Sequence, residues 1–127
     1  MRDHLDKALA VVLHDLEVTG APPPRVEESD WQTWPTAESA HLFSPDGSGV
    51  GVWVDTAVSD AERVAMLADQ VQDWAVENLA RRRATNWPQC PEHPENHPMV
   101  AGVRDGAAVW TCPTSRRQVC EIGRLGT

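Results

Sequence analysis

The sequence lacks the features that mark membrane-spanning and secreted proteins. Among its 127 residues, no hydrophobic run approaches the roughly 20 residues needed to cross a bilayer. The charged N-terminus, residues 1–7, has no apolar core of the kind found in signal peptides. The three cysteines are an odd number in a chain without a secretion signal, which favours reduced thiols over a disulfide framework. These absences predict a cytoplasmic protein with no membrane partner.

Tyrosine is absent, phenylalanine and lysine occur once each, and tryptophan occurs six times. This bias suggests a GC-rich genome and does not point to any activity. Hydrophobic residues make up 41% of the chain and charged residues 24%, a balance typical of globular rather than disordered proteins. The length suits one compact domain, or one domain with a small appendage.

The net charge of −8 is unevenly distributed along the chain. Residues 1–80 carry a net charge of −11, whereas residues 81–127 carry +3 and are rich in proline, cysteine, histidine and arginine. We therefore predict an acidic body, residues 1–84, followed by a distinct tail, residues 85–127.

Hydrophobic periodicity predicts two helices in the body. Apolar residues recur every three or four positions over residues 3–18, and Gly20 with the proline run behind it ends that helix. Residues 60–83 show the same periodicity, and Ser59 with Glu62 forms a capping box at their start. The three arginines that close this second segment suit the C-terminal end of a helix, where the dipole favours cations.

Strand patterns lie between the two helices. Residues 40–44 and 50–55 predict a hairpin, because an Asp-Gly turn separates two runs of strand-forming residues. We expect a further short strand around Trp31 and Trp34, and a solvated connector at the acidic stretch 25–30. The body is therefore predicted as α+β: an N-terminal helix, a small antiparallel sheet and a long helix packed on it.

The six tryptophans are expected to be mainly core residues. We place four in the core of the body and two beside a site in the tail, namely Trp31, Trp34, Trp53 and Trp74, followed by Trp87 and Trp110. Tryptophan is also frequent at the centre of protein interfaces, so one or two of them are candidates for partner contact.

The tail contains a candidate metal site. Cys90 and His93 have the spacing at which a tight turn directs two side chains at one ion. An Asp-Gly turn at residues 105–106 separates two strand-like runs, and a two-residue turn there pairs Met99 with Cys112. The distant thiol is thereby carried back toward the upstream imidazoles. We predict a closed tetrahedral Cys2His2 zinc site made by Cys90, His93, His97 and Cys112.

Cys120 is the alternative fourth ligand. If residues 113–116 turn the chain, Cys120 lies roughly 10 Å from the metal at about 3.3 Å per strand residue. A different register would let Cys120 replace His97. Two other interpretations remain: proline-rich turns with unrelated histidines and buried cysteines, and a Cys90–His93 nucleophile pair, which has no obvious third member.

A zinc ion in this tail is predicted to be structural. About forty residues with few large apolar side chains cannot build a strong core alone, so a metal would supply the missing folding energy. Four protein ligands also leave no open position for water, which disfavours catalysis.

The C-P-x-H knuckle, the hairpin and a second C-P knuckle make residues 87–123 resemble a zinc ribbon, although the second knuckle carries one clear ligand. The whole chain is similar to small uncharacterised actinobacterial proteins that combine an acidic α+β body with a W-P-x-C-P-x-H…W-x-C-P tail. The motifs that carry this resemblance are residues 44–47, 87–88, 90–93, 97–98 and 109–113. The resemblance implies a zinc-ribbon-like β-hairpin module and a bound metal, and it implies no activity.

These features predict a non-enzymatic interaction or adaptor protein with a structural zinc site. An acidic body suits a basic protein partner and would speed their encounter, and one version is an immunity or inhibitor protein against a basic enzyme. The alternative is a nucleic-acid-associated zinc ribbon that places the arginines of the tail on phosphates, although the acidic body would repel DNA or RNA.

Overall fold

The computed structural model describes residues 3–80, 86–94 and 97–126. Its helices and strands follow one another as α1 (Asp3–Val18), β1 (Arg25–Glu28), β2 (Ala37–Phe43), β3 (Gly49–Asp55), α2 (Asp60–Ala80), β4 (Val100–Arg104), β5 (Ala107–Thr111) and β6 (Gln118–Glu121). Neither helix in these ranges combines the length and the apolarity that a bilayer crossing requires.

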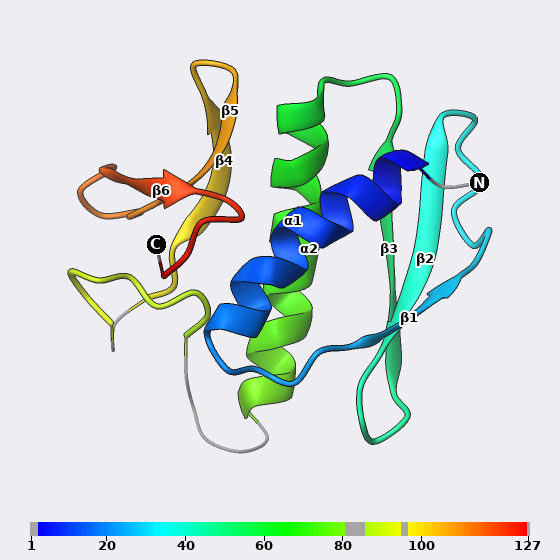
Figure 1. Ribbon diagram of the computed structural model, residues 1–127, viewed down its shortest axis with the longest axis horizontal. Helices are drawn as coiled ribbons and strands as arrows, with labels where there is room; N and C mark the ends of the chain where they lie inside the picture. The colour runs from blue at the N-terminus through cyan, green and yellow to red at the C-terminus, as the bar shows by residue number, and fades with distance from the viewer. Residues whose placement is uncertain (1–2, 81–85, 95–96, 127) are drawn as a thin grey trace.

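Helix α2 lies between two small antiparallel sheets (Figure 1). The first sheet has the strand order β1-β2-β3 and the second has the order β4-β5-β6. Helix α2 packs against β3 on one side and against β4 and β5 on the other, while α1 crosses α2 and reaches β2 and β3. The predicted α+β class is confirmed, and the tail forms three strands rather than a hairpin alone.

The apolar stripe of α1 explains its position on the core. Leu5, Leu9, Val12 and Leu16 are at most 4% exposed and belong to the hydrophobic cluster of the molecule. Beyond the helix, Gly20 adopts a φ of +78°, a conformation that glycine tolerates and other residues rarely adopt. The predicted limits of this helix, residues 3–18, are confirmed.

Helix α2 begins where the capping residues predict. The hydroxyl oxygen of Ser59 accepts a hydrogen bond from the Glu62 amide at 3.2 Å, so one of the unpaired donors of the first turn is satisfied. The arginines expected at the end of this helix, residues 81–83, lie outside the described residues.

The first sheet confirms one prediction and corrects another. The hairpin of β2 and β3 has the expected Asp-Gly connection, with Ala37 opposite Asp55 at one end and Phe43 opposite Gly49 at the other. The stretch predicted as a connector is instead strand β1, and the residues around Trp31 and Trp34 form no strand. All four residues of β1 are exposed, so it has none of the apolar alternation that marks a half-buried strand.

The tryptophans of the body divide between core and surface. Trp74 is only 5% exposed, whereas Trp31 and Trp34 are 40% and 60% exposed, so the prediction that these two lie in the core is wrong. Trp31 lies on the outer face of the first sheet, where its indole N–H donates to the Ala40 carbonyl at 2.9 Å. Because the opposite face of that sheet receives the helices, an indole on the outer face stays in contact with solvent.

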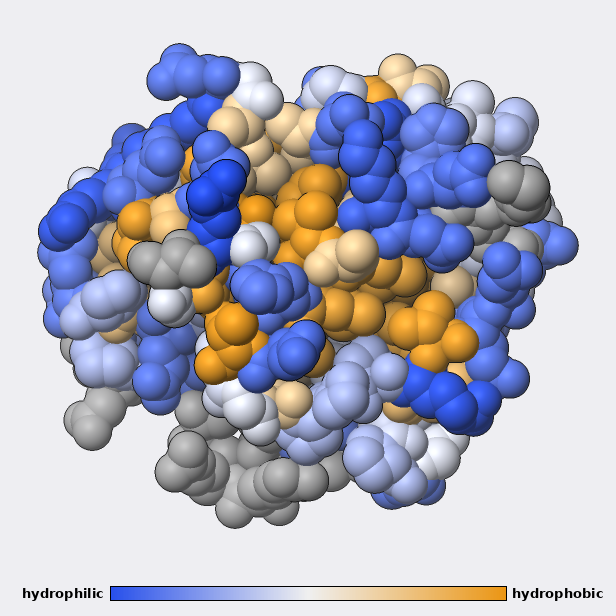
Figure 2. Space-filling view, in the orientation of Figure 1, coloured by the Kyte–Doolittle hydropathy of each residue, from blue (hydrophilic) through white to orange (hydrophobic). Residues whose placement is uncertain are grey.

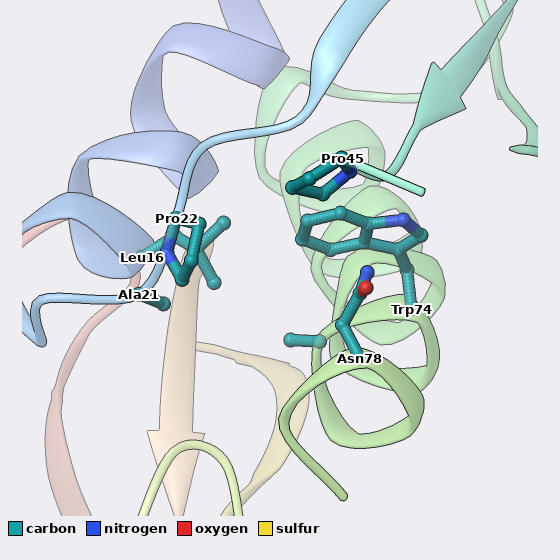
Figure 3. Close-up of a pocket in the computed structure, with 7 residues that line it drawn as sticks. Leu16, Ala21, Pro22, Pro45, Trp74 and Asn78 are labelled. Atoms are coloured by element: carbon teal, nitrogen blue, oxygen red, sulfur yellow. The ribbon is translucent and has the colours of Figure 1, made fainter. Parts of the chain in front are cut away.

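Trp74 lies at the end of the core nearest the β2–β3 connection. Its indole N–H donates to the Ser44 hydroxyl at 3.1 Å, and its ring lies beside Pro45 (Figure 3). Across a narrow apolar pocket, Leu16 and Pro22 face this ring from the end of α1 and the loop that follows it. The pocket is therefore a narrow gap between α1 and α2 rather than an enclosed cavity.

The second sheet has the register that the turn chemistry predicts. Asp105 and Gly106 both have positive φ angles, +50° and +78°, as a two-residue hairpin turn requires. Arg104 lies opposite Ala107, and the pairing continues to Val100 opposite Thr111. Strand β6 then adds to the other edge of β5.

Body and tail share one hydrophobic cluster. Its buried members include Leu16 and Val71 from the two helices, and Trp87, Met99 and Trp110 from the tail. The predicted boundary between residues 84 and 85 falls outside the described residues. The tail therefore packs on the face of α2 that the first sheet leaves open.

Candidate metal centre

Three chain segments converge on the predicted metal site. Gln89 and Pro98 form an isolated antiparallel bridge, and the Met99 amide donates to the Pro88 carbonyl at 2.9 Å. This pairing places the residues just before Cys90 beside the residues just after His97. Cys112 follows the last residue of β5 and reaches the same place from the hairpin.

The four predicted ligands lie together. One ligand atom from each of Cys90, His93, His97 and Cys112 can be chosen so that all four lie within 4.8 Å of one another. His93 Nδ1 is 3.9 Å from Cys90 Sγ and 3.7 Å from Cys112 Sγ, and His97 Nε2 is 4.0 Å from Cys112 Sγ. The edges of a tetrahedron with zinc–sulfur bonds of about 2.3 Å and zinc–nitrogen bonds of about 2.0 Å measure roughly 3.3–3.8 Å. The group is therefore close enough to hold a metal ion.

Sulfur and nitrogen ligands differ in burial. Cys90 and Cys112 are fully buried, whereas His93 and His97 are half-buried. The two imidazole rings lie 4.9 Å apart, centroid to centroid, and form the side of the site that faces solvent. An ion could thus reach the site past the histidines while the thiols stay protected.

The surroundings of His97 suit a metal ligand. Its Nδ1 lies 3.1 Å from the Pro98 carbonyl oxygen, which can only accept, so Nδ1 carries the proton in this contact. The lone pair then belongs to Nε2, which lies 4.0 Å from the Cys112 sulfur and 3.2 Å from the Thr114 hydroxyl. A backbone carbonyl that holds the outer N–H of a histidine is typical of metal-bound imidazoles.

Cys112 is poised as a thiolate. Hydrogen bonding from Ser115, from its side chain first and then its backbone N–H, lowers the pKa of Cys112 to about 6, and the Ser115 amide lies 3.4 Å from the sulfur. The thiolate is the form that binds metals, so this turn prepares the ligand before an ion arrives.

Cys120 has a different environment. It lies on β6 opposite Trp110, and it does not belong to the ligand group found among the described residues. The Cys112 amide donates to the Arg117 carbonyl at 2.9 Å, which is the turn that separates the two cysteines. Burial, and then the charges of Asp15 and Glu121, raise the pKa of Cys120, so its thiol is the weaker candidate ligand.

Two polar side chains that sequence reasoning missed hold the tail in place. Gln72 of α2 donates from Nε2 to the carbonyls of Trp87 and Met99, which flank the segment that carries both histidines. Asp15 of α1 is fully buried and accepts from the Trp110 indole at 2.8 Å. Both residues lie among apolar positions of their helices. A polar residue on an apolar helix face was the one feature of the sequence that could have indicated a buried hydrogen-bonding role.

Comparison with known proteins adds no assignment: no family model, no curated protein and no solved structure matches the chain.

Proposed function

We propose that this protein binds one structural Zn²⁺ through Cys90, His93, His97 and Cys112, and that it works as a non-enzymatic interaction protein in the cytoplasm. The single observation that supports the metal site is the convergence of four ligand atoms within 4.8 Å. The tail is then a zinc-ribbon-like module whose second knuckle supplies one cysteine.

The donor set favours zinc over other ions. Two thiolates and two imidazoles are soft and borderline ligands, which suit zinc and are poor ligands for magnesium or calcium. A Rieske-type iron–sulfur cluster also uses two cysteines and two histidines, but it binds the cysteines and the histidines on two different iron atoms. Here one ligand atom from each of the four residues lies within 4.8 Å of the others, which suits a single ion.

A structural role follows from the closed ligand set. Four protein ligands fill a tetrahedral zinc ion and leave no position for a reacting water. The site also joins the turn after Trp87 to the end of β5. The second sheet is small and buries few large side chains, so a bound ion would add a crosslink where the hydrophobic core is weak.

Metal analysis tests the proposal directly. Plasma mass spectrometry of the purified protein should find about one zinc per chain, and Cys90→Ser and Cys112→Ser should each lose it. Cys120→Ser is the matched control and should keep it, because Cys120 lies outside the ligand group. Cobalt offers a second readout, since a Cys2His2 site should give the intense visible bands of tetrahedral Co²⁺. Wild-type protein free of metal after refolding with excess zinc would refute the site.

The interaction role rests on charge. The net charge of −11 over residues 1–80 would attract a basic protein and speed encounter, which suits an adaptor and also an immunity or inhibitor protein against a basic enzyme. Affinity capture at low salt should recover a basic partner whose association rate falls as salt rises. An affinity that does not change between 50 and 500 mM salt would contradict charge-led binding.

Nucleic-acid binding is the second candidate, and one contact favours it. Arg104 donates to the Arg116 carbonyl at 2.6 Å, which brings the exposed Arg104 of β4 to the backbone of the exposed Arg116 in the loop before β6. A mobility-shift assay with a duplex and a single strand at 50 mM salt separates the candidates. No retardation at micromolar protein removes this alternative.

A further inference from the structure

The two cysteines of the candidate metal centre lie close enough to react with each other. One ligand atom from each residue of the group lies within 4.8 Å of the others, so the sulfurs of Cys90 and Cys112 are separated by 4.8 Å or less. Both thiols are free, and both contact the same nitrogen, His93 Nδ1. Neither cysteine belongs to a helix or a strand, so a disulfide, with its sulfurs at about 2.05 Å, can form here by movement of two turns.

The third cysteine, Cys120, is kept apart from this pair. It lies on β6 opposite Trp110, and it does not belong to the ligand group found in the described residues. The turn between Cys112 and β6 is closed by the Cys112 amide, which donates to the Arg117 carbonyl at 2.9 Å. Cys90 is therefore the thiol that Cys112 meets, although Cys120 is much nearer in the sequence.

The histidines lie where a small oxidant would enter. His93 and His97 are half-buried, whereas both cysteines are fully buried. Cys112 Sγ lies 3.7 Å from a nitrogen of one ring and 4.0 Å from a nitrogen of the other, while Cys90 Sγ contacts His93 alone of these two rings. Figure 2 shows mainly hydrophilic side chains over the second sheet, on the left of the view. A small polar molecule that enters by local opening between the rings therefore meets Cys112 first.

We propose that hydrogen peroxide oxidises Cys112, that Cys90 then forms a disulfide with it, and that the zinc ion is released in the same reaction. The release of zinc rests on the proposed metal site, whereas the disulfide needs only the two thiols. The protein is then a redox switch with a reduced, zinc-bound form and an oxidised, zinc-free form.

The reaction balances with hydrogen peroxide as the only added oxidant. The Cys112 thiolate attacks one peroxide oxygen: the S–O bond forms, the O–O bond breaks and hydroxide leaves. The Cys90 thiolate then attacks the sulfur of this sulfenic acid, the S–S bond forms and a second hydroxide leaves. The two sulfurs give up two electrons, which the peroxide accepts, and two protons from solvent convert both hydroxides to water. Only two imidazoles then remain as ligands, so the ion dissociates.

The disulfide preserves the crosslink that the ion provides. Both join the turn after Trp87 to the end of β5, and the buried side chains of Trp87, Met99 and Trp110 are not among the ligands. Oxidation therefore frees the two histidines on the solvent-facing side and keeps the core of the tail. By calorimetry, the oxidised, zinc-free protein should melt about 5 °C or more above the reduced, zinc-free protein, because a disulfide constrains the unfolded chain.

Peptide mapping of the full zinc-loaded chain tests the pairing. Trypsin cleaves after arginine and places the three cysteines on separate peptides, residues 84–104, 105–116 and 118–124. After treatment with about a tenfold excess of hydrogen peroxide, mass spectrometry without reduction should find the first two peptides joined and the third with a free thiol. A chromogenic chelator should detect the release of about one zinc per chain over the same time course, and dithiothreitol should reverse both changes.

Two variants make the test specific. Cys120→Ser is the matched control and should form the same disulfide at the same rate, because Cys120 lies outside the ligand group. Cys90→Ser removes the thiol that resolves the sulfenic acid. Dimedone, which reacts with sulfenic acids, should then label the peptide of residues 105–116.

The outcomes separate this proposal from the metal site. Zinc-loaded wild type that keeps its ion and its three thiols after peroxide treatment overturns the switch and leaves the metal site standing. Wild type without zinc refutes the metal site and the release of zinc with it, and the peptide map then decides on the disulfide alone. A link between residues 105–116 and 118–124, or zinc release with no link, also overturns the proposal.

Discussion

A single buried carboxylate joins the two ends of this chain. Asp15 Oδ2 accepts from the Trp110 indole at 2.8 Å and from the Gly123 amide at 2.7 Å, and Oδ1 accepts from the Leu125 amide at 2.9 Å. One buried indole and two amides of half-buried residues therefore depend on one side chain from α1. The position therefore matters far more than its single charge suggests.

Asp15→Ala should destabilise the protein by about 3 kcal/mol, because it leaves buried donors without an acceptor. Asp15→Asn keeps one acceptor oxygen and should cost about half as much. Urea unfolding followed by tryptophan fluorescence measures both. Equal stability of the alanine variant and the wild type would mean that these hydrogen bonds contribute nothing.

The pKa of a second residue, Cys112, predicts how zinc binding depends on pH. Hydrogen bonding from Ser115 lowers this pKa from its ordinary value to about 6, so the folded state favours the thiolate. A lowered pKa means that the thiolate is available at pH 7 and is lost as the pH falls through about 6, not as it rises. Zinc should therefore stay bound at pH 7 and be released only below about pH 6.

A chromogenic zinc chelator reports this release along a pH titration. The Cys120→Ser variant should give the same curve, because Cys120 lies outside the group of candidate ligands. Zinc release that begins near pH 8 would contradict the lowering of the Cys112 pKa by the Ser115 hydrogen bonds.

At the scale of elements, the β4–β5 hairpin positions the site. Its turn needs positive φ at two consecutive residues, and Gly106 meets this at +78° without strain. The register that follows carries Cys112 to the histidines. The proposed metal binding therefore depends on a turn several residues away from each of the four candidate ligands.

Gly106→Val should lower stability by about 1–2 kcal/mol and weaken zinc binding, because a β-branched residue is strained at positive φ. Gly102→Val is the control: a side chain there meets nothing within 4 Å, so stability and zinc content should be kept. Thermal unfolding and metal analysis of both variants decide. A Gly106→Val protein with wild-type zinc content and melting temperature would show that the turn does not govern the site.

At the scale of the whole molecule, the tail and the body are packed as one. Their buried side chains share a cluster, and the Trp87 indole donates to the Thr19 hydroxyl at 3.0 Å while the Trp110 indole bonds Asp15. Loss of the metal should thus destabilise both helices as well as the second sheet.

Removal of zinc by a chelator should lower the melting temperature by about 10 °C or more, in one transition for the whole chain. Differential scanning calorimetry with and without zinc measures this. Two transitions, of which the first alone responds to the chelator, would show instead that residues 1–84 and 85–127 unfold as separate units.

Local patterns were enough to predict the helices, two hairpins and the ligand group. The stripe of α1, the cap of α2 and the Asp-Gly turn at 105–106 are short-range signals, because each depends on residues within a few positions of one another. Counting back from that turn brought Cys112 to the histidines, since antiparallel pairing has a fixed register once the turn is known.

Short-range patterns thus predicted the α+β class, the limits of α1, the start of α2 and the meeting of two cysteines with two histidines. Long-range packing made β1 a strand, left Trp31 and Trp34 exposed, and used Asp15 and Gln72 to hold the tail. These features depend on residues far apart in the sequence. An exposed edge strand lacks the apolar alternation of a half-buried strand, and the partners of a buried polar side chain are set by packing between distant segments.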